Sequence, residues 1–326
     1  MPDDTSSQPS PALTGRAPTH PRARHAGLLT GPLPILTAAV LWGTTGTASS
    51  LAPTGAPAAA VGAAGLVLGG LLLFLTAPGG RSLPRTRTGG ERGLLAVGAL
   101  AVAGYPLSFY PAVARTGVAV ATVVALGGAP VLAGLLAWLT RQSRPTVRWA
   151  AATATAVLGC VALVLGPGLT GAGTPVDLPG VLLAAAAGLS YAVYALVGGQ
   201  LIARGHASGA VMGVMFGGAA VLVLPVVLWS AGPWLPTARG ALVVLYLGVV
   251  TTFLCYRLFG YGLRHTTAQT ATTLTLVEPA VAAVLGVAVL GERLPAVSWC
   301  GLAVLALGVV LLTRERRAEP QSSNRP

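Results

Sequence analysis

The sequence predicts an all-α integral membrane protein with ten transmembrane helices, built as two inverted five-helix repeats. Three observations support this fold class: long apolar segments recur, charged residues are scarce, and the two halves of the chain resemble each other. Apolar residues make up 54% of the 326 residues and charged residues only 9%, against roughly 25% in soluble domains. A soluble fold of this length needs more surface charge, so the chain is expected to lie in a bilayer.

Apolar segments of about 20 residues, the length that crosses a bilayer core, recur along most of the chain. The expected spans are 32–51, 57–77, 93–113, 117–139, 148–166, 179–201, 207–229, 239–261, 266–290 and 296–313. Turn-forming residues separate many of them, as in 52–57, 78–80 and 166–175. The first segment is too long and too similar to the later ones to be a cleaved signal peptide.

The distribution of arginine predicts the orientation. Residues 1–28 are rich in Pro, Ser, Thr and Arg and are expected to form a disordered tail. If this tail is cytoplasmic, Arg257 lies within a span, only Arg115, Arg239 and Arg293 fall outside, and all other arginines face the cytoplasm. The positive-inside rule therefore predicts that 1–28 and a second tail, 314–326, are both cytoplasmic.

An internal repeat is the next signal. Laying the chain on itself pairs short sequences in the two halves: Arg115-Thr116 with Arg264-His265, Ala129-Pro130 with Glu278-Pro279, Leu41-Trp42 with Ser190-Tyr191 and, one residue further along, Pro145 with Pro295. We therefore expect a first repeat over 29–166 and a second over 167–313. Five spans in each repeat invert the second repeat relative to the first. Inverted repeats around a midplane site are typical of secondary transporters, although channels also have them.

Other functions find little support in the sequence. The net charge of +12 would suit a nucleic-acid partner, but the arginines lie mostly between apolar segments, so no nucleic acid is expected. Cys160, Cys255 and Cys300 lie within apolar segments and have neither disulfide nor metal-site spacing. The sequence has no phosphate-binding loop, Ser-His-Asp set or paired carboxylates. We expect no enzymatic activity, no cofactor and no metal.

The segment 251–314 carries motifs of a known family. Leu276-Val277-Glu278-Pro279 is followed by Leu290-Gly291-Glu292-Arg293-Leu294 and by a last span from Trp299. Their order and spacing resemble the second repeat of the EamA family, within the drug/metabolite transporter (DMT) superfamily. The first repeat is similar through Leu41-Trp42-Gly43 and through Phe109-Tyr110 to Pro130.

The resemblance covers about 32–313 and implies a bacterial inner-membrane protein that exports small metabolites, amino acids or drugs by alternating access. Two departures limit what it carries over. Gly62 lies where the family often has an arginine, and Thr140-Arg141-Gln142 stands where Gly-Glu-Arg is expected.

Glu278 is the sharpest candidate for a functional residue. It lies near the middle of the span 266–290, where an ionisable group is costly unless it faces a cavity, a partner or a proton. Thr275 and Thr267 are expected on the same face, as the lining of a passage. Glu278 is predicted to bind a cationic or amine group of the substrate, or a coupling proton. The alternative is a purely structural hydrogen bond to a broken-helix backbone near Pro279.

Pro130 and Pro279 occupy equivalent positions in the two halves, and each removes a helix hydrogen bond. Gly127 and Gly128 directly precede the first. We predict hinges or broken helices there, with free carbonyl groups near the site. Simple tolerance of proline by a membrane helix is the alternative.

Trp42, Tyr191 and Tyr194 lie deep in their spans and are expected to line the cavity, unless they belong to the interfacial aromatic belt. Arg257 is expected to extend to the lipid headgroups, or else to pair with substrate or Glu278.

Two functions of other classes stay open. One is a passive channel or facilitator, and the other is a membrane-embedded enzyme acting on lipid-linked substrates. The second would need clustered polar groups near an interface, and the sequence offers none. The expected partners are a small-molecule substrate, the lipid bilayer and protons. A monomer or homodimer is expected, because one chain already contains both halves.

Overall fold

The computed structural model describes residues 31–77, 89–142, 144–165, 177–230, 232–290 and 296–318. Within these ranges every regular element is helical. The expected tail 1–28 and the predicted turns 78–80 and 166–175 lie outside the described residues, as does most of the motif 290–294.

The helices of the N-terminal half are α1 Pro32–Gly43, α2 Thr45–Ser50, α3 Ala58–Leu75, α4 Gly89–Thr122, α5 Gly128–Leu139 and α6 Val147–Leu165. The helices of the C-terminal half are α7 Leu178–Ala203, α8 Ser208–Ser230, α9 Ala238–Tyr246, α10 Cys255–Gly262, α11 Ala268–Leu274, α12 Val277–Leu290 and α13 Ala296–Ala318. Two π-helical segments interrupt these α-helices, η1 Val123–Gly127 and η3 Leu247–Leu254.

Five helical segments of the described chain are long and apolar enough to cross a membrane: Gly89–Thr116, Leu178–Ala203, Ser208–Ser230, Ala238–Gly262 and Ala268–Val289. Four shorter apolar helices accompany them: Ala59–Leu75, Val123–Leu139, Val147–Leu163 and Ala296–Leu311. Large apolar side chains point outward from these helices, with Leu158 65% and Leu228 68% exposed. Such a surface is stable against lipid tails, so the chain is a multi-pass membrane protein. The count of ten spans stays a prediction.

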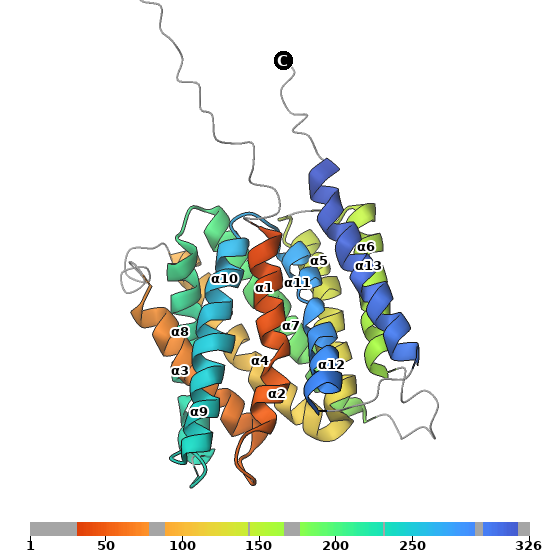
Figure 1. Cartoon of the computed structure of the whole chain (residues 1–326). Helices are drawn as coiled ribbons and strands as arrows, with labels where there is room; N and C mark the ends of the chain where they lie inside the picture. Colours follow the sequence, from red (N-terminus) through yellow and green to blue (C-terminus); the bar gives the residue numbers. More distant parts are fainter. Residues whose placement is uncertain are drawn as a thin grey trace, which may run out of the picture.

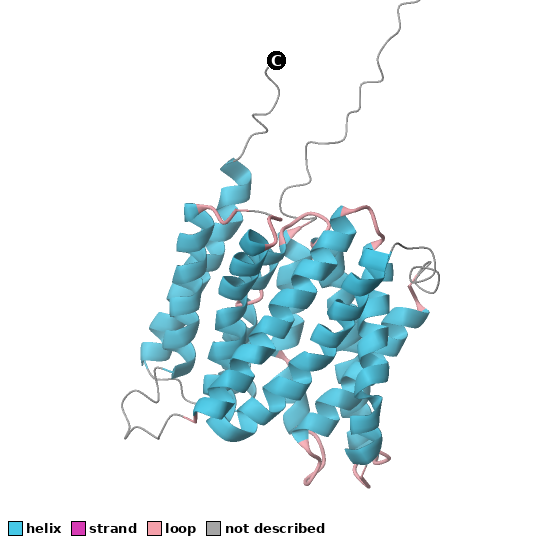
Figure 2. Cartoon of the chain, turned by 180° about the vertical axis from the view of Figure 1, so that it is seen from behind, coloured by secondary structure: helices cyan, strands magenta, loops and turns pink. Residues whose placement is uncertain are grey.

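The helices run side by side as one bundle (Figures 1 and 2). The start of α1 and the end of α13 lie at the same end of the bundle, and α2 and α9 lie at the other (Figure 1). α3 packs beside α8, α4 beside α7, and α6 beside α13 at one edge of the bundle. We call the two ends of the bundle the terminal end and the far end.

Two boundaries differ from the predicted ones. The predicted spans 93–113 and 117–139 are not separated by a non-helical turn, because α4 continues to Thr122 and passes directly into η1. The connecting residues 114–122 contain one glycine and no proline, so the local sequence does little to interrupt helical backbone. At the C-terminus α13 continues to Ala318, so residues 314–318 of the expected tail are helical.

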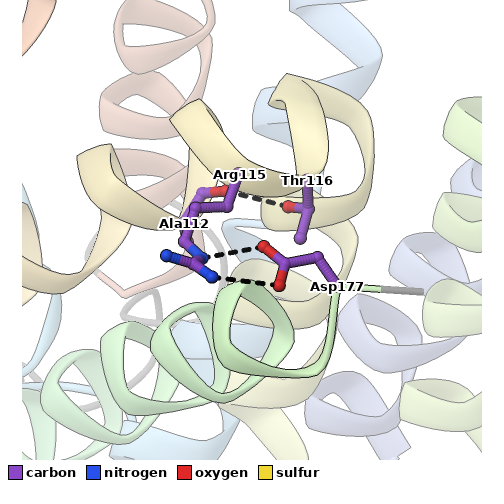
Figure 3. Close-up of polar contacts among 4 residues, drawn as sticks. All are labelled: Ala112, Arg115, Thr116 and Asp177. Atoms are coloured by element: carbon purple, nitrogen blue, oxygen red, sulfur yellow. Dashed lines mark hydrogen bonds and ion pairs between the residues drawn. The ribbon is translucent and has the colours of Figure 1, made fainter. Parts of the chain in front are cut away.

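An ion pair joins the two halves at the far end of the bundle. The guanidinium group of Arg115, on α4, donates to both carboxylate oxygens of Asp177, at the start of α7, over 2.8 and 3.2 Å. Figure 3 shows this fork, with the Thr116 hydroxyl bonded beside it to the carbonyl of Ala112. A two-point contact orients the two groups more strictly than a single bond does.

Glycine allows α6 and α13 to touch. A Cβ atom at Gly308 would lie 2.5 Å from the backbone nitrogen of Ala156, and one at Gly159 would collide with the backbone of Leu305. Without side chains at these positions the two backbones approach closely, which is how membrane helices commonly associate.

We therefore expect Gly308→Val to destabilise the protein by about 1–3 kcal/mol, because the added side chain has no room. The measurement is the thermal unfolding midpoint in detergent. Ala306→Val is the matched control, since Ala306 lies on the same helix with its side chain exposed. Equal midpoints for the two variants would show that the α6–α13 contact is not close-packed.

Candidate functional site

A cavity of about 210 Å³ lies inside the bundle. Its walls come from both halves of the chain. Most of the lining side chains are aromatic, hydroxylic or both: Trp42, Thr45, Tyr105, Phe109, Tyr110, Thr122, Tyr191, Tyr194, Phe216, Thr251, Thr252 and Tyr256. Gly62, Leu66, Val102, Pro106, Leu126 and Leu247 also line it. Glu278 is the only charged residue among the described residues of the lining.

A helix break places Glu278 at this cavity. α11 ends at Leu274 and α12 begins at Val277, so the chain leaves the helix at Thr275 and Leu276. Pro279 explains the position of the break, because its ring clashes with the carbonyl four residues earlier, that of Thr275, and it has no N–H to bond there. Glu278 therefore lies in the first turn of α12, where the helix N-terminus favours a negative charge.

The carboxylate of Glu278 has no described side chain bonded to it. Its backbone N–H donates to the carbonyl of Thr275 over 2.9 Å, but no hydrogen bond or ion pair joins its carboxylate to the described part of the protein. The structural alternative requires a hydrogen bond from the backbone near Pro279 to this carboxylate. The described residues form no such bond. The carboxylate is thus free to meet a ligand or a proton.

Trp42 holds the end of α1 against the π-helical segment η3. Its indole Nε1 donates to the backbone carbonyl of Thr251 over 2.7 Å. π-helical turns displace carbonyl groups from the regular helix pattern and are frequent at functional sites. Gly43 brings the same end of α1 to α12, since a Cβ there would lie 2.6 Å from the Cβ of Val281.

Two hydrogen bonds between hydroxyl groups stabilise the aromatic wall of the cavity. The hydroxyl groups of Tyr191 and Thr275 are 2.8 Å apart, which ties α7 to the helix break directly before Glu278. The hydroxyl groups of Tyr194 and Tyr256 are 3.0 Å apart. The ring of Tyr256 also packs against Phe216 at a centroid distance of 3.9 Å. The aromatic wall is therefore a connected set of side chains.

The predicted hinge in the first half lies beside η1. Gly127 ends η1, Gly128 begins α5, and Pro130 is the third residue of α5. The carbonyl that Pro130 leaves without its usual partner is that of Leu126, within η1. Leu126 lines the cavity, so both prolines lie next to irregular backbone at the site.

The structure brings Glu278, Trp42, Tyr191 and Tyr194 together at the cavity, and it places two predicted residues elsewhere. Thr275 is buried behind the wall and bonded to Tyr191. Thr267 caps α11, where its hydroxyl accepts the N–H of Thr270. Its expected place on the Glu278 face assumed one continuous helix, and the break after Leu274 removes that register.

Arg257 is exposed and lies apart from Glu278. Its guanidinium group lies 3.4 Å from the hydroxyl of Thr76 and over the ring of Phe253. This position agrees with the expected extension toward the headgroups rather than with a pair to Glu278.

Gly62 lines the cavity, at the position where the family often has an arginine. A Cβ at Gly62 would collide with the hydroxyl of Tyr110, so the phenol occupies the space that a longer side chain would need. The sequence interpretation did not place Tyr105, Tyr110, Thr251 or Thr252 in the lining. For the threonines the available signal was a pair of hydroxyl groups within an apolar span.

Comparison with known proteins follows the same division of the chain. The EamA-like transporter family matches residues 29–165 and 178–314. A Bacillus subtilis protein named as the uncharacterized transporter YwfM is 37% identical over 286 residues, which cover 87% of this chain and 94% of that protein. The threonine/homoserine exporter RhtA of Salmonella typhimurium is 33% identical over 146 residues, or 45% of this chain and 49% of that protein.

A solved crystal structure has the same fold. It superposes with a TM-score of 0.70 at 22% identity, over 86% of this chain and 97% of that chain.

We expect Tyr191→Phe to lower the stability by about 1 kcal/mol, because it removes the hydrogen bond to Thr275. Tyr105→Phe is the matched control, since the Tyr105 hydroxyl lines the same cavity without a hydrogen bond to the described residues. The measurement is thermal unfolding of both variants in detergent. A larger loss for Tyr105→Phe than for Tyr191→Phe would contradict this account of the wall.

Proposed function

Since this chain belongs to the EamA-like transporter family, we propose that it is a secondary transporter that exports a small metabolite, amino acid or drug across a bacterial inner membrane by alternating access. One observation carries the proposal: a carboxylate with no described bonding partner faces a cavity inside an apolar helix bundle. Such a group is costly to keep unless it serves a substrate or a coupling ion.

The proposed architecture is ten spans in two inverted repeats, 29–166 and 167–313, with both termini in the cytoplasm. The two family matches, one in each half, support it. The common end for the start of α1 and the end of α13 supports an even number of crossings (Figure 1). Alternating access then arises when the halves exchange conformations about a midplane site. The helix break before Glu278 and the π-helical segment η1 are the proposed hinges.

In this orientation the cavity lies on the outer side of the midplane. Trp42 is in the last turn of α1, which begins at the terminal end, and Gly62 is in the second turn of α3, which begins at the far end. Toward the terminal end the side chains of Phe216 and Phe259 are buried. Their burial supports the proposal that this conformation faces outward and that the cytoplasmic opening would require these rings to separate.

The cavity favours a substrate that carries an amine. Glu278 supplies a negative charge, and the rings of Trp42, Tyr105 and Tyr256 supply faces that attract cations. The described lining contains no basic side chain that could bind a carboxylate, and Gly62 occupies the position where the family often has an arginine. The same carboxylate can exchange a proton for the amine, which would couple export to the proton gradient.

Glu278→Gln is expected to reduce transport roughly tenfold or more, because the amine loses its charged hydrogen-bond acceptor. The measurement is extracellular metabolite accumulation in overproducing cells at equal membrane expression. Glu91→Gln is the matched control, because Glu91 lies at the start of α4 and bonds to His206 outside the cavity. Unchanged export by Glu278→Gln would overturn the assigned role.

Reconstituted vesicles separate a transporter from a passive channel. Vesicles loaded with unlabelled compound are expected to accumulate labelled compound transiently above its equilibrium level, as counterflow through a carrier requires. Uptake that neither saturates nor shows counterflow would favour the channel alternative.

The substrate class is tested with matched pairs that differ by one carboxylate. Homoserine pairs with 3-aminopropan-1-ol, and threonine pairs with 1-aminopropan-2-ol. We expect the two amines to inhibit export or counterflow of the native substrate more strongly than the two amino acids. Stronger inhibition by the amino acids would contradict the preference for a cation but not the proposal that the protein is a transporter. It would instead favour an amino-acid substrate of the kind named for RhtA.

A further inference from the structure

A groove runs along the outside of the bundle between α5 and α6, and it shares no lining residue with the cavity at Glu278. It encloses about 670 Å³ and is almost wholly apolar. Its walls are formed chiefly by Val131, Leu135, Trp138, Trp149, Val157 and Leu158. Several of these side chains face outward, with Leu135 47% and Leu158 65% exposed. An elongated apolar groove on the bilayer-facing surface has the chemistry of an acyl-chain site.

A side chain that lines this groove carries a hydrogen-bond donor without a partner among the described residues. The indole Nε1 of Trp149 is buried, and no described residue accepts a hydrogen bond from it. Gly134 provides the space for the ring, because a Cβ there would lie 2.5 Å from it. A buried N–H without an acceptor costs free energy. Trp149 is in the first turn of α6, and tryptophan is enriched where membrane helices meet the headgroup region.

A polar hollow lies beside the groove at the terminal end of the bundle. This polar hollow encloses about 600 Å³ and is lined by Trp138, Leu139, Arg141 and Arg144. Trp138 lines both hollows, so they are neighbours on the surface. Both arginines are exposed, and neither forms an ion pair with a carboxylate in the described ranges. Guanidinium groups bind phosphate through two parallel hydrogen bonds.

The backbone at Arg141 shows that an arginine there has a cost. Arg141 has φ of +55°, in the left-handed region where glycine is the usual residue. It follows the C-cap of α5, with its N–H bonded to the carbonyl of Trp138 and the N–H of Gln142 bonded to that of Ala137. This is the helix-ending motif that favours glycine.

We propose that this groove binds one anionic phospholipid. Its phosphate lies between Arg141 and Arg144, the ring of Trp149 flanks the ester groups, and an acyl chain fills the groove along Val131 and Leu158. Basic pockets between membrane helices bind acidic headgroups in this way. A second copy of this chain fits less well, because a symmetric contact at this end would bring the two pairs of arginines together.

The test is native mass spectrometry of the purified full chain in detergent, with equal amounts of dioleoyl-phosphatidylglycerol and dioleoyl-phosphatidylcholine. We expect the phosphatidylglycerol adduct to predominate, by roughly fivefold for each arginine that contacts the phosphate. The double variant Arg141→Gly with Arg144→Gln is expected to lose the preference. Arg204→Gln is the matched control, since Arg204 is exposed at the same end but lies outside the groove.

Thermal unfolding separates lipid loss from misfolding. Arg141→Gly relieves the left-handed backbone, so its midpoint in lipid-free detergent is expected to equal or exceed that of the native protein. Trp149→Phe is expected to lower phosphatidylglycerol retention without removing the preference over phosphatidylcholine. Equal retention of the two lipids by the native protein, or a preference that survives in the double variant, would overturn the proposal.

Discussion

A carboxylate inside an apolar helix bundle is the feature on which the rest of this architecture depends. An ionised Glu278 needs polar surroundings. The bundle provides them because the helix is interrupted directly before this residue. Pro279 breaks the span directly before it, so the carboxylate sits in the first turn of α12. The hydroxyl pair of Tyr191 and Thr275 then fixes that break to α7. The helix break and this hydrogen bond together hold Glu278 at the cavity.

Irregular backbone serves the protein at more than one place. In η3 the carbonyl of Thr251 accepts a hydrogen bond from the indole of Trp42. In η1 the carbonyl of Leu126 lacks its usual partner because of Pro130, and Leu126 lines the cavity. At the outer surface, Arg141 holds a conformation that suits glycine, beside an apolar groove. In each case an unfavourable backbone state is retained next to a place where a small molecule or lipid is proposed to bind, which is where such strain is usually found.

Much of this could be predicted from the sequence because it rests on simple periodic or local rules. Apolar length marks the membrane segments, and Pro279 marks the broken helix. The deep aromatic residues Trp42, Tyr191 and Tyr194 do lie around Glu278. Thr267 shows where such reasoning fails, since a face assigned on one continuous helix is lost once the helix breaks. The π-helical segments and the contact between Gly62 and Tyr110 depend on tertiary packing, for which a single sequence has no local signal.

The most direct test is chemical modification of Glu278 in the native protein, in membranes. A carbodiimide that partitions into apolar cavities is expected to label Glu278, as located by peptide mass spectrometry, and a transported amine is expected to slow that labelling. Asp177, paired with Arg115 at the far end, provides an internal reference whose reactivity the amine should not change. Glu278 that stays unlabelled, or labelling that no transported compound slows, would contradict the claim that this carboxylate receives the substrate.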